Sequence, residues 1–257
     1  MRTVITIIIV CFIFVFSACD KEIEKGVMKS DLSKDVELIT DYGTIILRLS
    51  DETPKHRNNF IKLVNQKVYD GVSFHRVINN FLIQTGDIGQ DTSGLSYMID
   101  AEFRSDLFHK RGAVNAARMG DDQNPERSSD GTQFTIIQGN TYNDSTLAIA
   151  EKRINTWLAY NKVINKPEHE SDLDKLDSLT NIELMTMDHY SFPEAHREIY
   201  KTLGGAAHLD QNYTVFGEVV KGMNIVDSIA GVETDSQDKP INDVRIISAR
   251  MIKRKSY

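Results

Sequence analysis

The sequence predicts a mainly β fold, a closed antiparallel barrel capped by two helices, and three observations support this. Short apolar runs of strand length recur along most of the chain. Glycines mark many of the intervening turns, and two short segments carry helix signals at their ends. Many strands with glycine-marked turns and few helices are typical of closed barrels, which leave no strand edge unpaired. One helical stretch, 142–203, interrupts this pattern.

The first 18 residues are expected to be a lipoprotein signal peptide. Arg2 is followed by a run of 12 residues, 4–15, that are apolar except for Thr6. The run is too short to span a hydrocarbon core of about 30 Å and has the length of a signal-peptide core. Phe-Ser-Ala-Cys, residues 16–19, resembles the bacterial lipobox, so we expect Cys19 to carry a lipid. The alternative is an ordinary secretory signal that leaves Cys19 free. The second cysteine, Cys11, lies in the signal, so no disulfide framework is possible.

Residues 19–35 are rich in charge and poor in apolar side chains, which predicts a flexible tether to a folded domain over residues 36–253. The apolar content of 40% and charged content of 26% are ordinary for a globular protein. The net charge of −7 provides no basic surface for nucleic acid, so we expect no nucleic-acid partner.

The elements of the domain follow in chain order. Residues 36–40 and 44–50 predict two strands around a short hairpin connection, in which Gly43 can take a positive φ. Residues 53–66 predict a helix with Thr53 as its cap and proline at its first position. A second helix is expected over 222–232, ending near its terminal glycine. Further strands are expected over 72–78, 82–86, 112–118, 133–138, 214–220 and 244–252.

The stretch 142–203 predicts three helices inserted between two strands of this β domain. Apolar residues recur at helical spacing over 146–165, and 173–185 has a similar pattern. The third helix is expected within 191–205, capped by Ser191 and stopped by a Gly-Gly pair.

Three sequence blocks together resemble the cyclophilin-type peptidyl-prolyl cis-trans isomerases. FHRVINNFLIQTGD, residues 74–87, resembles the signature of that family. GAVNAAR at 112–118 with DGTQFTII at 130–137 resembles its central segment, and residues 208–227 resemble its late segment. The resemblance implies an eight-stranded barrel with a helix at each end, a catalytic groove on its outer face, and no metal or organic cofactor. The seven histidines show no metal-ligand spacing.

The reaction implied by the resemblance needs no covalent step. Rotation about an X–Pro bond is opposed by amide resonance, with a barrier of about 18–20 kcal/mol, and takes tens to hundreds of seconds uncatalysed. An enzyme must favour the twisted amide over both planar forms. Arg76, a charge within an apolar strand, can direct a guanidinium at the prolyl nitrogen and weaken that resonance. The alternative is a strand arginine that forms only a surface salt bridge.

The resemblance assigns the other site residues one by one. Gln84 is expected to act with Arg76 in catalysis, and with Gln133 it orients the peptide backbone. The remaining expected substrate-binding residues are Phe81, Leu82 and Leu209 as apolar walls, Ala117, where the peptide backbone passes closely, Tyr213, and Thr135.

Thr135 departs from the family pattern, which has a second pocket phenylalanine there. Losing roughly 50–80 Å² of apolar contact weakens binding by about 1–2 kcal/mol. We therefore expect a wider, wetter proline socket and modest activity, which Thr135→Phe should raise. Trp157 or Phe192, from the helical stretch, could instead fill the gap; Thr135→Phe would then overpack the site.

Two functions are therefore open at this stage. One is an isomerase that acts on X–Pro bonds in exported proteins and assists their folding. The other is a membrane-tethered proline-peptide-binding or chaperone module with little turnover. In both cases the expected partners are proline-containing polypeptides and, through a lipid on Cys19, a membrane. We expect a monomer in the envelope of a Gram-negative-type bacterium, facing the periplasm or the cell surface.

Overall fold

The computed structural model describes residues 21–89, 97–166 and 175–257. The expected signal peptide and Cys19 lie outside these residues. The expected catalytic and substrate-binding residues all lie within them.

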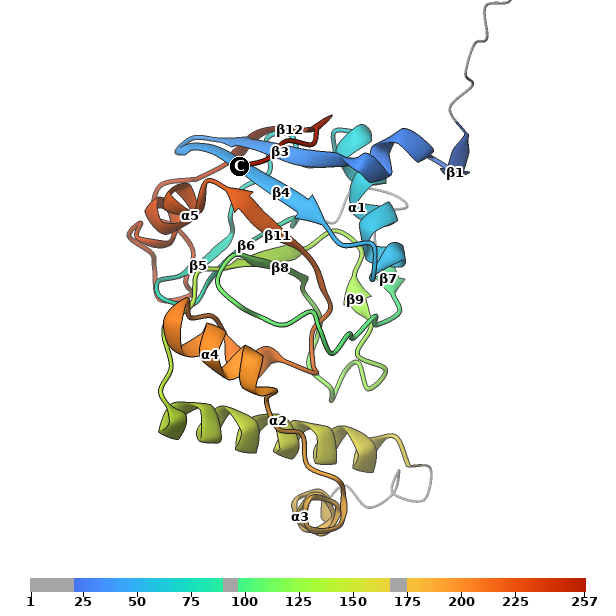
Figure 1. The fold of residues 1–257 in the computed structure, drawn as a ribbon, viewed down its shortest axis with the longest axis vertical. Helices are drawn as coiled ribbons and strands as arrows, with labels where there is room; N and C mark the ends of the chain where they lie inside the picture. Colours follow the sequence, from blue (N-terminus) through green and yellow to red (C-terminus); the bar gives the residue numbers. More distant parts are fainter. Residues whose placement is uncertain (1–20, 90–96, 167–174) are drawn as a thin grey trace, which may run out of the picture.

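The centre of the molecule is a strongly curled antiparallel sheet of eight strands, in the order β12-β3-β4-β11-β8-β10-β6-β5 (Figure 1). Each strand coincides with a segment that the sequence predicted to be extended. Their bounds are β3 Lys34–Thr40, β4 Gly43–Leu49, β5 Arg76–Ile78, β6 Leu82–Thr85, β8 Ala113–Ala116, β10 Phe134–Ile137, β11 Val215–Lys221 and β12 Ile246–Lys253. A separate two-stranded sheet joins β7 Met98–Ile99 to β9 Ser129–Asp130.

The prediction of a closed barrel is wrong, because the strand ladder ends at β5 and β12. The chain before β5 does approach the start of β12: Phe74 N–H donates to the Val244 carbonyl at 2.8 Å, and a single bridge joins Ser73 to Arg245. β5 itself is only three residues long and begins beyond this contact. The two edge strands therefore meet through turns and a few hydrogen bonds, and the sheet is an open half-barrel.

The predicted helices at the two ends of the sheet are α1 Pro54–Asn65 and α5 Met223–Ala230. Both contribute apolar side chains to the core inside the curled sheet. Thr53 occupies the predicted cap position of α1, but its buried hydroxyl makes no capping bond and has no hydrogen-bond partner among the described residues. Gly43 has φ +133° in the β3–β4 turn, and a Cβ there would lie 2.8 Å from the Ile225 side chain of α5.

The described part of the predicted tether, residues 21–35, is folded onto the domain, so the prediction of flexibility is wrong there. It forms β1 Glu22–Glu24, β2 Val27–Met28 and a 3-10 helix η1, Lys29–Ser33. Val27 is fully buried in the main core. The Asp31 carboxylate accepts from the Met28 backbone at 2.9 Å and from the Asn65 side chain at 3.2 Å. Burial of Val27 and the hydrogen bonds of Asp31 therefore hold this segment on the domain. Its composition, which is rich in charge, does not indicate such contacts.

The stretch 142–203 contains the three predicted helices: α2 Asp144–Ile164, α3 Leu176–Thr186 and α4 Glu194–Thr202. They lie together on one side of the curled sheet, with α4 between α2 and the sheet in this view (Figure 1). Ser191 is not the cap of α4, because the cap position falls on Pro193. That this stretch is an insertion into the fold remains a prediction.

A second, smaller core joins these helices to the rest of the molecule. Leu147, Ala150 and Ile154 of α2 pack with Phe192, Tyr200 and Phe108. Beside them, Asp210 is buried and accepts three hydrogen bonds, from the His109 backbone and ring at 2.9 and 2.7 Å and from the Tyr200 hydroxyl at 2.9 Å. This polar network joins Tyr200 of α4 to the segments that contain His109 and Asp210.

Within residues 21–89, 97–166 and 175–257, none of the helices has the length and apolar character needed to cross a membrane.

Candidate functional site

Strand alternation separates the core from the site. Along β10, Phe134 and Ile136 point into the main core, whereas Ile137 belongs to a second apolar cluster outside it. Along the neighbouring strand β6, Ile83 is in the main core and Leu82 is in the outer cluster. Successive side chains of a strand point to opposite faces, so Gln84 and Thr135, which pair across the two strands, share the outer face with Leu82 and Ile137.

A pocket of about 340 Å³ lies over this outer face. Its volume falls in the range of ordinary ligand sites. The residues that line it are Arg76, Phe81, Leu82, Gln84, Asn115, Ala117, Arg118, Thr135, Arg153, Trp157, His208, Leu209 and Tyr213. We call its strand-borne part, with Arg76, Leu82, Gln84 and Thr135, the sheet wall. We call the part built by α2 and by η4, Ala207–Leu209, with Arg153, Trp157, His208 and Leu209, the helical wall.

The structure thus places every predicted site residue in the pocket lining except Gln133. Gln133 lies just before β10 and accepts a hydrogen bond from the Gln84 side chain at 3.1 Å. Gln84 in turn accepts from Arg76 Nη1 at 3.5 Å, across a β5–β6 register that pairs the two residues. The three predicted polar side chains therefore form one chain of donors and acceptors, with Arg76 at one end.

Arg76 also faces a carboxylate, which bears on the salt-bridge alternative. Its Nε lies 3.6 Å from Asp238 Oδ2, and both side chains are about half exposed. An exposed pair at this distance contributes little to stability. The guanidinium is thus loosely held, because neither Gln84 nor Asp238 is at ideal hydrogen-bond distance. Its donors remain able to turn towards a ligand in the pocket.

The apolar part of the pocket is set by a tight turn between β5 and β6. Asn80 has φ +62° in this turn, and the carbonyl of Phe81 accepts from two backbone N–H groups, of Gln138 and Gly139, both at 3.0 Å. Leu82 and Leu209 are almost fully buried in the outer cluster, and the half-buried Phe81 packs against it. These three residues supply the apolar surface that the sequence predicted for a proline ring.

Thr135 does not leave a free hydroxyl in the pocket. It is 4% exposed, and its hydroxyl donates to the buried Asn115 side chain at 2.6 Å. Trp157, one of the two aromatic candidates for filling the gap, lines the same pocket; Phe192 lies in the small helical core instead. A phenylalanine at 135 would break the bond to Asn115 and compete with Trp157 for space. We therefore replace the expectation of a gain with its alternative: Thr135→Phe should lower activity.

The ring of His208 forms an aromatic part of the helical wall. Its ring lies 5.3 Å from that of Phe81 at an interplanar angle of 30°. Burial, and secondarily the nearby Arg153 charge, lower the pKa of His208 to about 4. It is therefore neutral at pH 7.

Arg118, Tyr213 and Ala117 form the far rim. The Arg118 guanidinium pairs with Asp121 at 2.6 Å, donates to the Asn212 carbonyl at 2.6 Å, and lies 4.8 Å from the Tyr213 ring. The Ala117 N–H donates to the Gln133 carbonyl at 3.0 Å. Arg118 is therefore a neutralised, positioned side chain, and the small Ala117 leaves the approach to the sheet open.

Sequence reasoning did not identify Arg153 and Asn115 as site residues. Arg153 and Trp157 are four residues apart on α2, a spacing that places two side chains on one helix face, and the guanidinium lies 4.5 Å from the Trp157 ring. That spacing is a signal in the sequence, but it does not show that this face meets the groove. Asn115 points to the outer face of a strand whose sequence is otherwise apolar.

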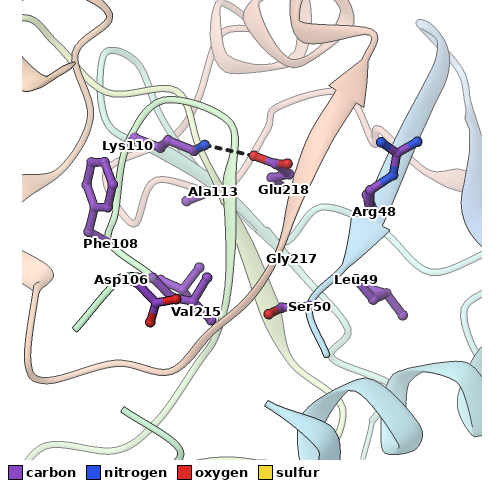
Figure 2. Close-up of a pocket in the computed structure, with 11 residues that line it drawn as sticks. Arg48, Leu49, Ser50, Asp106, Phe108, Lys110, Ala113, Val215, Gly217 and Glu218 are labelled. Atoms are coloured by element: carbon purple, nitrogen blue, oxygen red, sulfur yellow. Dashed lines mark ion pairs between the residues drawn. The ribbon is translucent and has the colours of Figure 1, made fainter. Parts of the chain in front are cut away.

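A different pocket, of about 270 Å³, lies on β4, β8 and β11 (Figure 2). No predicted site residue lines it. Lys110 pairs with Glu218 at 2.8 Å across it, and Arg48 pairs with Asp35 at 3.0 Å. Among the described residues, no group of three or more His, Cys, Asp or Glu side chains could hold a metal ion.

Comparison with known proteins identifies the relatives of this chain. The sequence profile of the family described as cyclophilin type peptidyl-prolyl cis-trans isomerase/CLD matches residues 35–148 and 151–251. A Staphylococcus saprophyticus protein, named as a candidate peptidyl-prolyl cis-trans isomerase, is 28% identical over 85% of this chain and 92% of its own length. A Streptococcus pyogenes protein, named as a candidate bifunctional phosphatase and peptidyl-prolyl cis-trans isomerase, is 32% identical over 82% of this chain, which spans 37% of that longer protein.

Among solved structures, a Cryptosporidium parvum cyclophilin type peptidyl-prolyl cis-trans isomerase superposes with a TM-score of 0.56 at 18% identity, over 86% of this chain and 99% of its own. A second structure of that protein, in the presence of the dipeptide Ala-Pro, gives a TM-score of 0.55. At this identity the likeness supports the fold alone.

Proposed function

This chain belongs to the cyclophilin-type peptidyl-prolyl cis-trans isomerases, and we propose that it accelerates X–Pro rotation in proteins that fold outside the cytoplasm. Isomerase activity and proline-containing peptide substrates follow from the family. The location of the substrates rests on the predicted signal peptide and on Cys19. The Cryptosporidium parvum neighbour was solved in the presence of Ala-Pro, a dipeptide that contains an X–Pro bond, and this dipeptide is the core of the test peptides below.

One observation carries the assignment of the reaction to this pocket. A loosely held guanidinium, Arg76, and an apolar surface formed by Phe81, Leu82 and Leu209 line the same cavity. Recognition of the proline ring needs the apolar surface. Weakening of the amide resonance needs a hydrogen-bond donor close to that surface, within reach of the prolyl nitrogen. The electrostatic interaction of such a charge with a bound peptide is stronger in a half-buried pocket than in water.

The proposed mechanism follows from this arrangement. The proline ring packs on the three apolar side chains. Gln84 and Gln133, already hydrogen-bonded to each other, hold the peptide backbone on one side of the bond. Arg76 donates towards the prolyl nitrogen as that nitrogen becomes pyramidal. The charge acts mainly on the twisted amide, so it lowers the barrier rather than only tightening binding.

Exchange spectroscopy by NMR on an Ala-Pro peptide tests turnover directly, because it measures cis–trans interconversion without a second enzyme. We expect catalytic amounts of the purified protein to accelerate exchange well above the uncatalysed rate. Binding of the peptide without acceleration would instead indicate the chaperone-like module.

The membrane location has its own test. If Cys19 is acylated more than once, as firm anchoring requires, the protein should sediment with membranes, and Cys19→Ser should move it to the soluble fraction. Ser17→Ala, two residues away, is the matched control and should leave it on membranes. Membrane association that survives Cys19→Ser would refute the anchor.

A further inference from the structure

The helical wall contributes a charge that the isomerase mechanism does not use. Arg153 lies on α2, one turn before Trp157, and both side chains line the pocket that holds Arg76 and the apolar surface. The guanidinium lies over the indole at 4.5 Å. Stacking of this kind holds an arginine in place while leaving its N–H donors at the edge available.

The three arginines of the pocket differ in how they are neutralised. Arg118 is bound by Asp121 at 2.6 Å, and Arg76 faces Asp238 at 3.6 Å. Arg153 has no carboxylate within salt-bridge distance among residues 21–89, 97–166 and 175–257. Among the residues that the structure describes, the pocket lining contains three arginines and no Asp or Glu, in a chain whose net charge is −7. The pocket is thus a positive site on an acidic protein, and Arg153 is its unpaired charge.

We propose that Arg153 is a specificity-determining residue that binds an acidic side chain of the substrate, within about two residues of the proline. This inference rests on the proposed function of the pocket. An extended peptide advances about 3.3 Å per residue, so a cavity of about 340 Å³ accommodates the proline and its nearest neighbours only. A carboxylate at that range can accept from a guanidinium held on an indole, whereas a lysine there would be repelled by the unpaired charge of Arg153.

Matched peptides test the proposal. Each peptide contains an Ala-Pro core and one Glu, placed at the first or second position before the dipeptide or at the first or second position after it. A matched set carries Gln, the neutral isostere, at the same positions. NMR exchange gives kcat/KM for each, using the full chain in mild detergent. We expect at least one position at which Glu exceeds Gln by about 2–5-fold, the range for an exposed ion pair, and a ratio that shrinks as salt is raised.

Three variants decide whether Arg153 is responsible. Arg153→Gln should abolish the Glu preference, and Arg153→Glu should transfer it to the corresponding Lys peptide. Lys152→Gln removes the same charge from the neighbouring, exposed position of α2, which does not line the pocket, and should keep the preference. No Glu preference in the natural chain, or a preference that Arg153→Gln leaves intact, overturns the proposal. Equal loss in Lys152→Gln would assign the effect to net charge and also overturn it.

Binding of the peptides can be measured separately from their isomerisation. Trp157 is the single tryptophan of the chain and lines the pocket, so its fluorescence gives Kd for each Glu and Gln peptide. Turnover without a Glu preference in kcat/KM or Kd refutes the role of Arg153 alone. A Glu preference in Kd without turnover refutes the isomerase mechanism and leaves the role of Arg153 standing.

Discussion

The two walls of the pocket are held in place by different physical means. The sheet wall is fixed by backbone ladders: β6 pairs with β5 and β10, and β10 pairs also with β8. The helical wall has no such ladder. It depends on a small aromatic core and on the buried Asp210 network, which adjoins Leu209.

This difference between the two walls indicates which wall suits the catalytic residues and which suits the residues that select the substrate. A ladder sets side-chain positions by register, so it suits the residues that must meet the reacting bond, Arg76 and Gln84. A wall held by side-chain packing can change its residues without disturbing the sheet, so it suits contacts with the rest of the substrate. Substitutions in each wall can test this division.

The largest effect is expected from Asp210→Ala, which removes the shared acceptor of His109 and Tyr200. Breaking a buried charged network by deleting one partner costs about 3–5 kcal/mol of unfolding free energy, measurable by urea denaturation. Asp144→Asn, an exposed carboxylate on the same helical side, is the control and should change little. If Asp210→Ala is as stable as that control, the network does not hold the helical wall.

Arg76→Ala comes next and tests the sheet wall. Losing a donor to the twisted amide should lower kcat/KM by a factor of roughly 10²–10³, about 2.7–4 kcal/mol of barrier, with little change in melting temperature. Asp238→Asn is the matched variant, because it removes only the carboxylate partner. An equal loss of activity in Asp238→Asn would show that the ion pair, rather than the guanidinium, matters.

Thr135→Val keeps the shape of the sheet wall but removes the hydroxyl that donates to buried Asn115. An unpaired buried acceptor costs about 1–3 kcal/mol, so thermal or chemical unfolding should occur earlier, while kcat/KM per folded molecule stays near that of the natural chain. Thr135→Ser, which retains the donor, should recover most of this stability. A large loss of kcat/KM with full stability would place Thr135 in direct contact with substrate.

The smallest effect is a pH dependence of stability from His208. Its pKa is lowered in the folded state, mainly by burial, from 6.5 to about 4. The unfolded chain therefore binds the extra proton first, and stability is complete above pH 6.5 and is lost as pH falls towards 4. Between pH 7 and pH 6 this group alone removes about 0.7 kcal/mol. His208→Gln should reduce the pH-induced loss by that amount; an unchanged slope would mean that His208 is not buried as a neutral ring.

The local elements and most of the sheet wall could be predicted from the sequence because their signals are local. Short apolar runs of strand length identified the eight strands of the curled sheet, and the block at 74–87 placed Arg76, Phe81, Leu82 and Gln84 in one hairpin. Register then follows from a short turn, since a slip of one residue would expose the whole core face.

Several features were decided only by tertiary structure, because their causes lie between distant segments. The barrel stays open because the three-residue β5 ends its ladder before it meets β12. Residues 21–35 are ordered because Val27 and Asp31 find burial and partners on α1, which their own composition does not reveal.

The position of the helical wall was also decided only by tertiary structure. Helical spacing predicted α2, but not that its Arg153–Trp157 face would lie against the groove. That placement depends on the packing of Tyr200 and Phe192 and on three hydrogen bonds to Asp210, contacts between residues up to a hundred positions apart. Local sequence determines which elements form, whereas the burial of side chains from remote segments determines which of their faces meet.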